Sequence, residues 1–351
     1  MNDALLDLLI DPKNGRRLSL DVRSRAADGS IEEGTLTGDG GERYAVTAGI
    51  PRFVRTQDSG QLQTSDAFGY KWGQRESYED DAAIRVYRDW LVAKYGFAST
   101  EAWASYFDGR SRILDVGCGS GYSSALWLDT PQWRGNAMYV GVDISNAVDV
   151  AKQRLGHIAN AQFVQADALQ MPFPPGSFDA IFSEGVLHHT PSTREALLCC
   201  ARLLAPGGEF HFYVYRKKGP LREFTDDHVR AAIAGMDNDA AWEAMRPLTK
   251  LARELARLHA EVEVEDIPAL GIRAGRYDVQ RLIYWNFAKL FWNESYPFDA
   301  NLHVNFDWYR PRYANRQTES EVRAWCAEAG LRINRFHGEE SGFTVIAARP
   351  R

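Results

Sequence analysis

The chain has 351 residues, of which 45% are hydrophobic and 25% are charged, values typical of a globular protein that buries a core. Its 41 basic and 47 acidic residues give a net charge of −6, which excludes the overall positive field that drives non-specific nucleic-acid binding. Four cysteines without a Cys-x-x-Cys pair exclude a disulfide framework and predict free thiols. Because the first residues are acidic and no apolar run approaches about 18 residues, we expect a cytoplasmic protein without a membrane span.

Two segments precede the main domain. Residues 1–60 alternate short apolar stretches with turns rich in Gly and Asp, a pattern that predicts a small β-rich unit of strands and hairpins. Residues 61–111 change to a helical pattern rich in aromatic residues.

Residues 112–215 alternate strand and helix patterns, which is typical of an α/β, doubly wound parallel sheet. The predicted strands cover residues 112–116, 138–143, 161–164, 178–182 and 209–215. The predicted helices include residues 147–155 and 193–204.

A long insertion separates this domain from its C-terminal part. Residues 216–318 have helical periodicity, with one helix expected near 240–261 and an aromatic one near 276–292. A helix over 319–329 and strands over 332–336 and 342–348 then complete the α/β pattern.

The clearest motif is Asp115-Val-Gly-Cys-Gly-Ser-Gly121, which follows the first predicted strand of the main domain. The G-x-G-x-G spacing of Gly117, Gly119 and Gly121 lets the backbone approach a ligand without Cβ clashes. Asp143 ends the next predicted strand, where a carboxylate can accept both hydroxyls of a ribose. Asp115 would repel a phosphate but suits a cationic amine. The motif therefore predicts an adenosine with an amino-acid-like tail.

With these residues the sequence resembles the class I S-adenosylmethionine-dependent methyltransferases. Asp167, in Gln165-Ala-Asp-Ala168, falls where that family contacts the adenine amino group, and residues 171–179 and 203–208 resemble its approaches to the fourth and fifth strands. The resemblance covers residues 112–215 and 319–351 and implies a seven-stranded, mostly parallel, Rossmann-like sheet. It implies S-adenosylmethionine as cofactor and, as its binding residues, Asp115, Gly117, Cys118, Gly119, Gly121, Asp143, Ile144, Asp167, Ala168 and Glu184.

The segment after the fourth predicted strand, residues 183–191, bears on the acceptor class. It lacks the Asn/Asp-Pro-Pro-aromatic tetrad of enzymes that methylate base amines, and no Pro-Cys nucleophile is present. His188 and His189 resemble the subgroup of the family that acts largely on small molecules. His189 and, after it, His188 are candidate catalytic bases. The alternative is that a ring caps the helix or packs under the cofactor, because methyl transfer can proceed by alignment and desolvation alone.

Aromatic and basic residues outside the motif are candidates for the acceptor pocket. Residues 68–72 and 305–313 are dense in aromatics. The stretch 213–222 leaves the sheet at the edge where open α/β sheets bind ligands, and its cations could receive an anionic acceptor, with a solvated turn of Arg216, Lys217 and Lys218 as the alternative. The candidate set is Tyr70, Trp72, Tyr215, Arg216, Trp308, Tyr309 and Tyr313. It predicts a planar or anionic acceptor under a lid formed by residues 216–318, with residues 61–111 as a further cover.

The N-terminal unit resembles the zinc-ribbon domain that precedes some methyltransferases, including a ribosomal RNA guanine enzyme. Its two Cys-x-x-Cys pairs would fall near residues 11–14 and 38–41, and all four cysteines are missing. Because structural zinc needs such ligands, we expect the outline of the ribbon without a metal.

The sequence thus predicts a methyltransferase that moves a methyl group from S-adenosylmethionine to a small-molecule acceptor by in-line displacement. One alternative is an RNA methyltransferase, which would need a basic surface stripe. Another is a non-catalytic module that only binds the cofactor. We expect neither nucleic acid nor a membrane as a partner, and the pattern predicts no particular oligomeric state.

Overall fold

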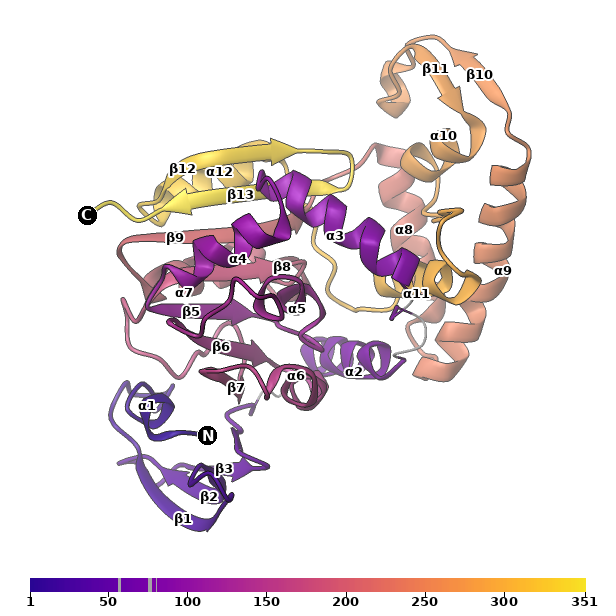
Figure 1. The fold of residues 1–351 in the computed structure, drawn as a ribbon. Helices are drawn as coiled ribbons and strands as arrows, with labels where there is room; N and C mark the ends of the chain where they lie inside the picture. Colours follow the sequence, from indigo (N-terminus) through magenta and orange to yellow (C-terminus); the bar gives the residue numbers. More distant parts are fainter. Residues whose placement is uncertain (56–57, 75–77, 80) are drawn as a thin grey trace.

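A seven-stranded sheet forms the centre of the main domain (Figure 1). The computed structural model describes residues 1–55, 58–74, 78–79 and 81–351. The strands are β5 (Arg112–Val116), β6 (Met138–Asp143), β7 (Ala161–Gln165), β8 (Phe178–Glu184), β9 (Leu204–Tyr215), β12 (Arg332–Gly338) and β13 (Gly342–Ala348). Their order is β12-β13-β9-β8-β5-β6-β7; the strands from β9 to β7 run parallel, and the β12–β13 hairpin is antiparallel. The predicted fold class is confirmed.

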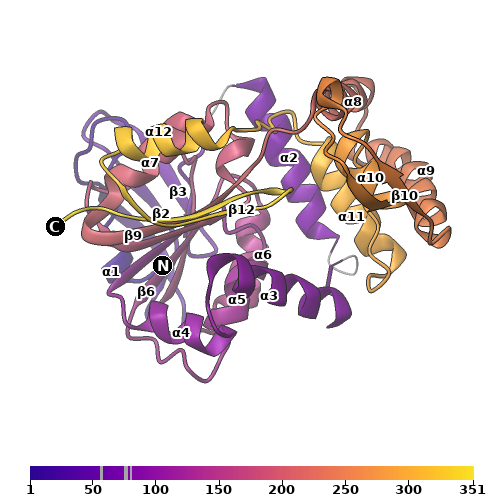
Figure 2. The same cartoon turned by 90° about the horizontal axis from the view of Figure 1, so that it is seen from above.

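Helices cover both faces of this sheet (Figure 2). They are α4 (Thr100–Asp108), α5 (Tyr122–Leu128) and α6 (Ala147–Leu155) on one face, and α7 (Thr193–Leu203) and α12 (Glu319–Glu328) on the other. Ile113 and Leu114 are neighbours in β5, and both are fully buried, each in a different apolar core. Such two-sided burial explains why the parallel strands read as continuous apolar runs.

The N-terminal unit covers one edge of the large sheet. It contains α1 (Asp3–Leu6) and an antiparallel sheet of β1 (Ser19–Arg25), β2 (Ile31–Thr37), β3 (Arg43–Thr47) and β4 (Ile50–Pro51). The amide of Phe53 donates to the carbonyl of Gln165 in β7 at 2.7 Å, and the guanidinium of Arg52 pairs with Asp149 at 2.6 Å. The unit thus satisfies polar groups that an edge strand otherwise leaves unpaired.

The position expected for the first cysteine pair of a zinc ribbon holds a buried carboxylate. Asp11 is fully buried and accepts the hydroxyl of Tyr44 at 2.9 Å and the amide of Lys13 at 2.9 Å. Nowhere in the described residues do three His, Cys, Asp or Glu side chains gather as a metal site. The β-rich unit is present, and its likeness to a zinc ribbon stays a prediction.

The remaining elements gather beyond the carboxyl ends of the parallel strands (Figure 1). Those before the sheet are α2 (Ser59–Gly73) and α3 (Asp81–Tyr95). Those of the insertion are α8 (Pro220–Ile233), α9 (Asn238–Arg257), β10 (Glu261–Val264), η3 (Pro268–Leu270), β11 (Gly275–Asp278), α10 (Val279–Asn286) and α11 (Phe298–Tyr309). A third apolar core joins α8, α9 and α11 to the end of β9. In these described parts of the chain, no helix combines the length and apolar composition needed to cross a bilayer.

The helix predicted over residues 276–292 is wrong at both ends. Its first residues belong to β11, and α10 ends at Asn286. Beyond this point, polar side chains of α11 accept hydrogen bonds from backbone amides that would otherwise donate within a helix. Asn305 accepts the amide of Phe291 at 2.9 Å, and Asn301 accepts that of Asn293 at 2.7 Å. Tertiary hydrogen bonds therefore outweigh the local helical pattern.

Two phenylalanines test the contribution of the α4 core. Phe107 is fully buried with its ring 4.4 Å from that of Trp127, whereas Phe224 on α8 is 70% exposed. We expect Phe107→Ala to lower the free energy of unfolding by about 3–5 kcal/mol, because it removes a buried ring and leaves a cavity. The matched Phe224→Ala change is expected to shift it by at most about 0.5 kcal/mol. Denaturant unfolding of both variants measures this, and equal effects would contradict the packing described.

Candidate active site

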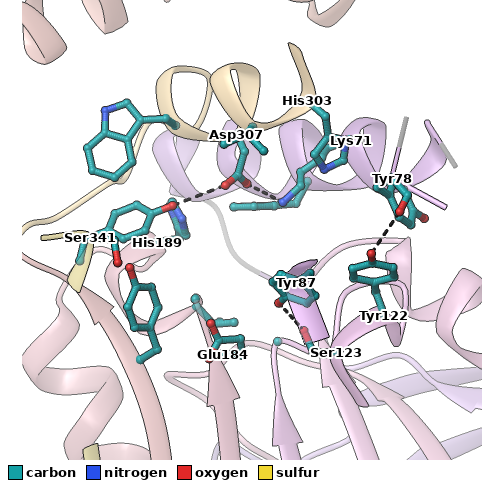
Figure 3. Close-up of a pocket in the computed structure, with 18 of the residues that line it drawn as sticks. Lys71, Tyr78, Tyr87, Tyr122, Ser123, Glu184, His189, His303, Asp307 and Ser341 are labelled. Atoms are coloured by element: carbon teal, nitrogen blue, oxygen red, sulfur yellow. Dashed lines mark hydrogen bonds and ion pairs between the residues drawn. The ribbon is translucent and has the colours of Figure 1, made fainter. Parts of the chain in front are cut away.

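A cavity of about 640 Å³ lies at the carboxyl edge of the parallel strands, between the sheet, α2, α3 and the insertion. Figure 3 shows Lys71, His303 and Asp307 reaching into it from the helices above, while Glu184 and Ser123 lie at its floor. Open α/β sheets bind ligands at this edge. The cavity has the size of a small-molecule site. Its walls come from the sheet and from the helical segments that precede and follow it.

The glycine loop after β5 approaches the cavity with its backbone. Gly117 and Gly119 have φ angles of +72° and +54°, in the left-handed region that favours glycine. A Cβ on Gly119 would lie 2.7 Å from the indole nitrogen of Trp72, and one on Gly117 would overlap the side chain of Val186. Gly117 and Cys118 line the cavity. Gly119 and Gly121 do not, and Gly121 instead allows close packing against Leu155 of α6.

Asp143, at the end of β6, is held by donors on both oxygens and faces the cavity. Its Oδ2 accepts the amide of Gly119 at 2.8 Å, and its Oδ1 accepts the amide and the hydroxyl of Ser145 at 2.8 Å and 2.6 Å. Burial raises the pKa of Asp143, and these hydrogen bonds oppose the shift. Since a carboxylate offers about four acceptor sites, one remains free here, fewer than the two expected for a ribose.

Two predicted cofactor residues lie behind the cavity wall. Asp115 is 2% exposed and accepts the hydroxyls of Ser124 at 2.5 Å and Tyr139 at 2.7 Å, while burial raises its pKa to about 6. Asp167 accepts the amide of Leu169 at 2.9 Å. Of the predicted set, the structure brings these to the cavity: Gly117, Cys118, Asp143, Ile144, Ala168 and Glu184. It does not bring Asp115, Gly119, Gly121 or Asp167 there.

Glu184, at the end of β8, forms part of a buried charge network. It pairs with Lys94 of α3 and accepts the hydroxyl of Tyr95 at 2.8 Å. The Lys94 ammonium lies 3.5 Å from the ring centre of Trp90 and 3.8 Å from that of Tyr213. Burial lowers the pKa of Lys94 to about 8, and Glu184 opposes this shift. The network fixes a carboxylate at the cavity floor.

The two candidate bases differ in their surroundings. The Nδ1 of His189 lies 2.6 Å from the carbonyl oxygen of Tyr313. Because a carbonyl can only accept, Nδ1 carries the hydrogen and Nε2 keeps its lone pair. Burial lowers the pKa of His189 to about 4, so the ring is neutral at pH 7. His188 does not line the cavity. The centre of its ring lies 3.6 Å from that of Tyr215, with the two planes inclined by 30°, and neither nitrogen has a hydrogen-bond partner among the described residues.

An ion pair across the cavity has no signal in the sequence. Lys71 of α2 and Asp307 of α11 lie 2.5 Å apart, and Asp307 also accepts the hydroxyl of Tyr215 at 3.5 Å (Figure 3). Burial alone would raise the pKa of Asp307, but Lys71 and His189 hold it at about 2. The pair links two segments that are 236 residues apart.

The predicted acceptor residues divide into two groups. Trp72, Tyr215 and Trp308 line the cavity. The others do not: the hydroxyls of Tyr70, Tyr309 and Tyr313 bond to Asp239, Asp226 and Asp58, and Arg216 is exposed on the outer surface. Two cations of the stretch 213–222, Lys218 and Arg222, line the cavity as well. Arg281 and Lys289, which the sequence reasoning missed, also line it, and so does Lys71 of the segment 68–72.

Comparison with known proteins identifies the central domain. Residues 114–212 match the family described as Methyltransferase domain. Over 114 residues the chain is 34% identical to a fatty-acid O-methyltransferase of Mycolicibacterium smegmatis, covering 32% of this chain and 40% of that protein. Over 102 residues it is 35% identical to the 27-O-demethylrifamycin SV methyltransferase of Amycolatopsis mediterranei, covering 28% and 36%. The chain thus spans less than half the length of these relatives.

One solved structure matches much of the chain at low identity. It is the magnesium protoporphyrin IX methyltransferase of Synechocystis PCC 6803, with a TM-score of 0.44 at 17% identity, covering 83% of this chain and 100% of that one. Residues 114–212, which include the glycine loop, are thus similar to a methyltransferase domain. This similarity supports S-adenosylmethionine as the cofactor.

The lowered pKa of His189 has a consequence for stability. An unfolded histidine titrates near 6.5, whereas folded His189 titrates at about 4, so the unfolded chain binds the proton first as the pH falls. Stability from this residue is present above pH 6.5 and is lost as the pH falls toward 4. When the pH is lowered from 7 to 5, the free energy of unfolding falls in the unmodified protein partly because of His189. We expect this fall to be about 2 kcal/mol smaller in His189→Gln. Urea unfolding at both pH values measures this, and identical losses would contradict the neutral, buried ring.

Proposed function

We propose that this protein transfers a methyl group from S-adenosylmethionine to a small-molecule acceptor by in-line displacement. The observation that carries the proposal is that the glycine loop and Asp143 open into the same cavity as the helical insertion. Cofactor and acceptor would then share one chamber, as methyl transfer requires.

The residues present fit the cofactor's adenosine. Gly117 and Cys118 present backbone without a bulky side chain, and Asp143 offers a fixed carboxylate with one free acceptor site. Ile144 and Ala168 add apolar wall beside them. When bound, S-adenosylmethionine supplies an electrophilic methyl group. Asp115 would act indirectly, by fixing the strand end from which the loop starts.

The parts of the chain outside the sheet would close this chamber. We propose residues 61–111 as a cover for cofactor and substrate and residues 216–318 as the acceptor lid, with the Lys71–Asp307 pair joining the two. Closure excludes water from the reacting atoms and strengthens the electrostatic interactions inside. His189 is the candidate base, because its Nε2 holds a free lone pair on a residue that lines the cavity.

The acceptor is proposed to be planar or anionic. Trp72, Tyr215 and Trp308 supply aromatic walls, and basic side chains of the insertion lie among them. The relatives named for a fatty acid and a rifamycin support a small-molecule acceptor. A macromolecular acceptor such as RNA fits less well, because these basic residues line a cavity instead of forming an outer stripe.

Cofactor binding is tested with two matched aspartates. We expect the unmodified protein to bind S-adenosylhomocysteine in isothermal titration, and Asp143→Asn to weaken binding at least about tenfold, or 1.4 kcal/mol, because an amide cannot accept all the donors around it. Asp149→Asn, which alters an outward ion pair to Arg52, is expected to leave binding unchanged.

Two outcomes would count against the proposal. No binding of S-adenosylhomocysteine by the unmodified protein would overturn the proposed cofactor, and equal binding by Asp143→Asn would remove Asp143 from the site. Formation of S-adenosylhomocysteine from S-adenosylmethionine with a pool of cell metabolites separates an enzyme from a module that only binds the cofactor.

A further inference from the structure

Four basic side chains of the insertion gather at one side of the cavity. Lys218 follows β9, Arg222 lies on α8, Arg281 on α10 and Lys289 after α10, and we call this group the lid cation cluster. Three of its members, Lys218, Arg222 and Lys289, are close enough to repel one another. Arg222 and Lys289 lower the pKa of Lys218, and Arg222 lowers that of Lys289, in addition to the larger effect of burial.

Lys289 differs from the other members in its lack of polar partners. Only 8% of the residue is exposed, and its ammonium lies 4.3 Å from the ring centre of Trp308. Within the described residues the structure shows no hydrogen bond or ion pair of this ammonium. Lys289 lines the cavity, so an anion bound there could supply the counterion that this ammonium lacks.

Among the described residues, Lys218 is also without a carboxylate at hydrogen-bond distance. Its ammonium donates to the backbone carbonyls of Glu340 and, at 3.2 Å, Ser341, which carry no full charge. Burial lowers the pKa of Lys218 to about 7, and burial lowers that of Lys289 to about 7 as well. Two lysines in one wall therefore lack a directly bonded counterion.

The acidic groups nearby are largely engaged elsewhere. Asp226 pairs with Arg222 at 2.9 Å and also accepts the indole of Trp308 at 2.8 Å. Asp307 pairs with Lys71. Glu339 accepts the indole of Trp90 at 3.0 Å and the hydroxyl of Ser341 at 2.6 Å.

Glu340 is the remaining acidic neighbour. It raises the pKa of Lys218 but is itself exposed, so solvent screens its charge. Asp307 and Asp226 raise the pKa of Lys289 without bonding to it. Lys218 and Lys289 therefore line the cavity with no carboxylate of the described residues bonded to either ammonium.

Aromatic rings surround these cations. The Lys218 ammonium lies 5.4 Å from the ring centre of Trp285, and the Arg222 and Arg281 guanidinium carbons each lie 5.5 Å from that of Tyr284. A ligand that binds here through an anionic group must have a body that fits against apolar walls lined by aromatic rings.

We infer that the lid cation cluster binds the oxyanion of the acceptor, a carboxylate or a phosphate carried on an apolar body, with Lys289 and Lys218 as its direct ligands. The inference rests on the proposed function, since it names the substrate class of the same chamber. It assigns specificity to the insertion, while the sheet edge holds the groups near the reacting atoms.

Three probe molecules test this assignment. Protein with and without saturating S-adenosylhomocysteine is titrated with 3-phenylpropionate, phenyl phosphate and the neutral 3-phenylpropionamide, and binding is followed by ligand-observed NMR. We expect at least one anion to bind at least tenfold more tightly than the amide. Comparison of the two anions then distinguishes a carboxylate site from a phosphate site.

Lysine variants locate the effect. Lys289→Met and, separately, Lys218→Met are expected to reduce the preference for the anion at least fivefold, while binding of S-adenosylhomocysteine is retained and shows that the variant is folded. Lys217→Met is the matched control, because Lys217 is exposed and does not line the cavity, and it should keep the full preference.

The inference is overturned if no anion binds more tightly than the amide, if no probe binds, or if both Lys289→Met and Lys218→Met keep the preference of the control. Failure of the unmodified protein to bind S-adenosylhomocysteine is a separate result. It would overturn the proposed cofactor, while the titrations on the cofactor-free protein still decide whether the cluster binds anions.

Discussion

Burial of the parallel strands on both faces is the constraint on which the rest of the structure depends. Because Ile113 and Leu114 in β5 face two different apolar cores, no polar function fits along the middle of the strand. Polar groups are confined to the carboxyl edge, where the chain turns out of the sheet. The glycine loop, Asp143 and Glu184 all lie at that edge, each at or just beyond the end of a strand. The N-terminal unit supports the same sheet from its β7 side, through Arg52 and Phe53.

The edge becomes an enclosed chamber only through segments distant in sequence. Lys71 and Asp307 meet from α2 and α11, and the Tyr313 carbonyl sets the tautomer of His189 from beyond α11. The first contact joins α2 to the insertion, and the second joins the insertion to the loop after β8. These contacts also influence protonation inside the cavity, because Lys71 and His189 lower the pKa of Asp307. Burial of Asp307, His189 and Lys71 strengthens the electrostatic interactions among them.

Charge is distributed unevenly within the chamber. Asp143 and Glu184 give the sheet side a negative floor, and Glu184 is balanced by Lys94, which lies below it among aromatic rings. The insertion contributes the positive side, where Arg222 has a carboxylate partner and Lys289 has none at hydrogen-bond distance in the described residues. Under the function proposed above, a cationic cofactor and an anionic acceptor would each meet an environment of opposite charge.

The sequence by itself determined the sheet, the glycine loop and the carboxylate of Asp143, because strand and turn patterns are local and because β5 and β6 place their ends side by side. It also indicated His189, Trp72 and Trp308. It could not show that Asp115, Tyr309 and Tyr313 lie outside the cavity wall. The residue type does not reveal whether a polar side chain faces the cavity or is hydrogen-bonded to other parts of the protein. It missed Lys71, Asp307 and Lys289, and it continued α10 too far. Only the tertiary structure decided these points, because ion pairs across 236 residues and amides bonded to Asn301 and Asn305 leave no local pattern.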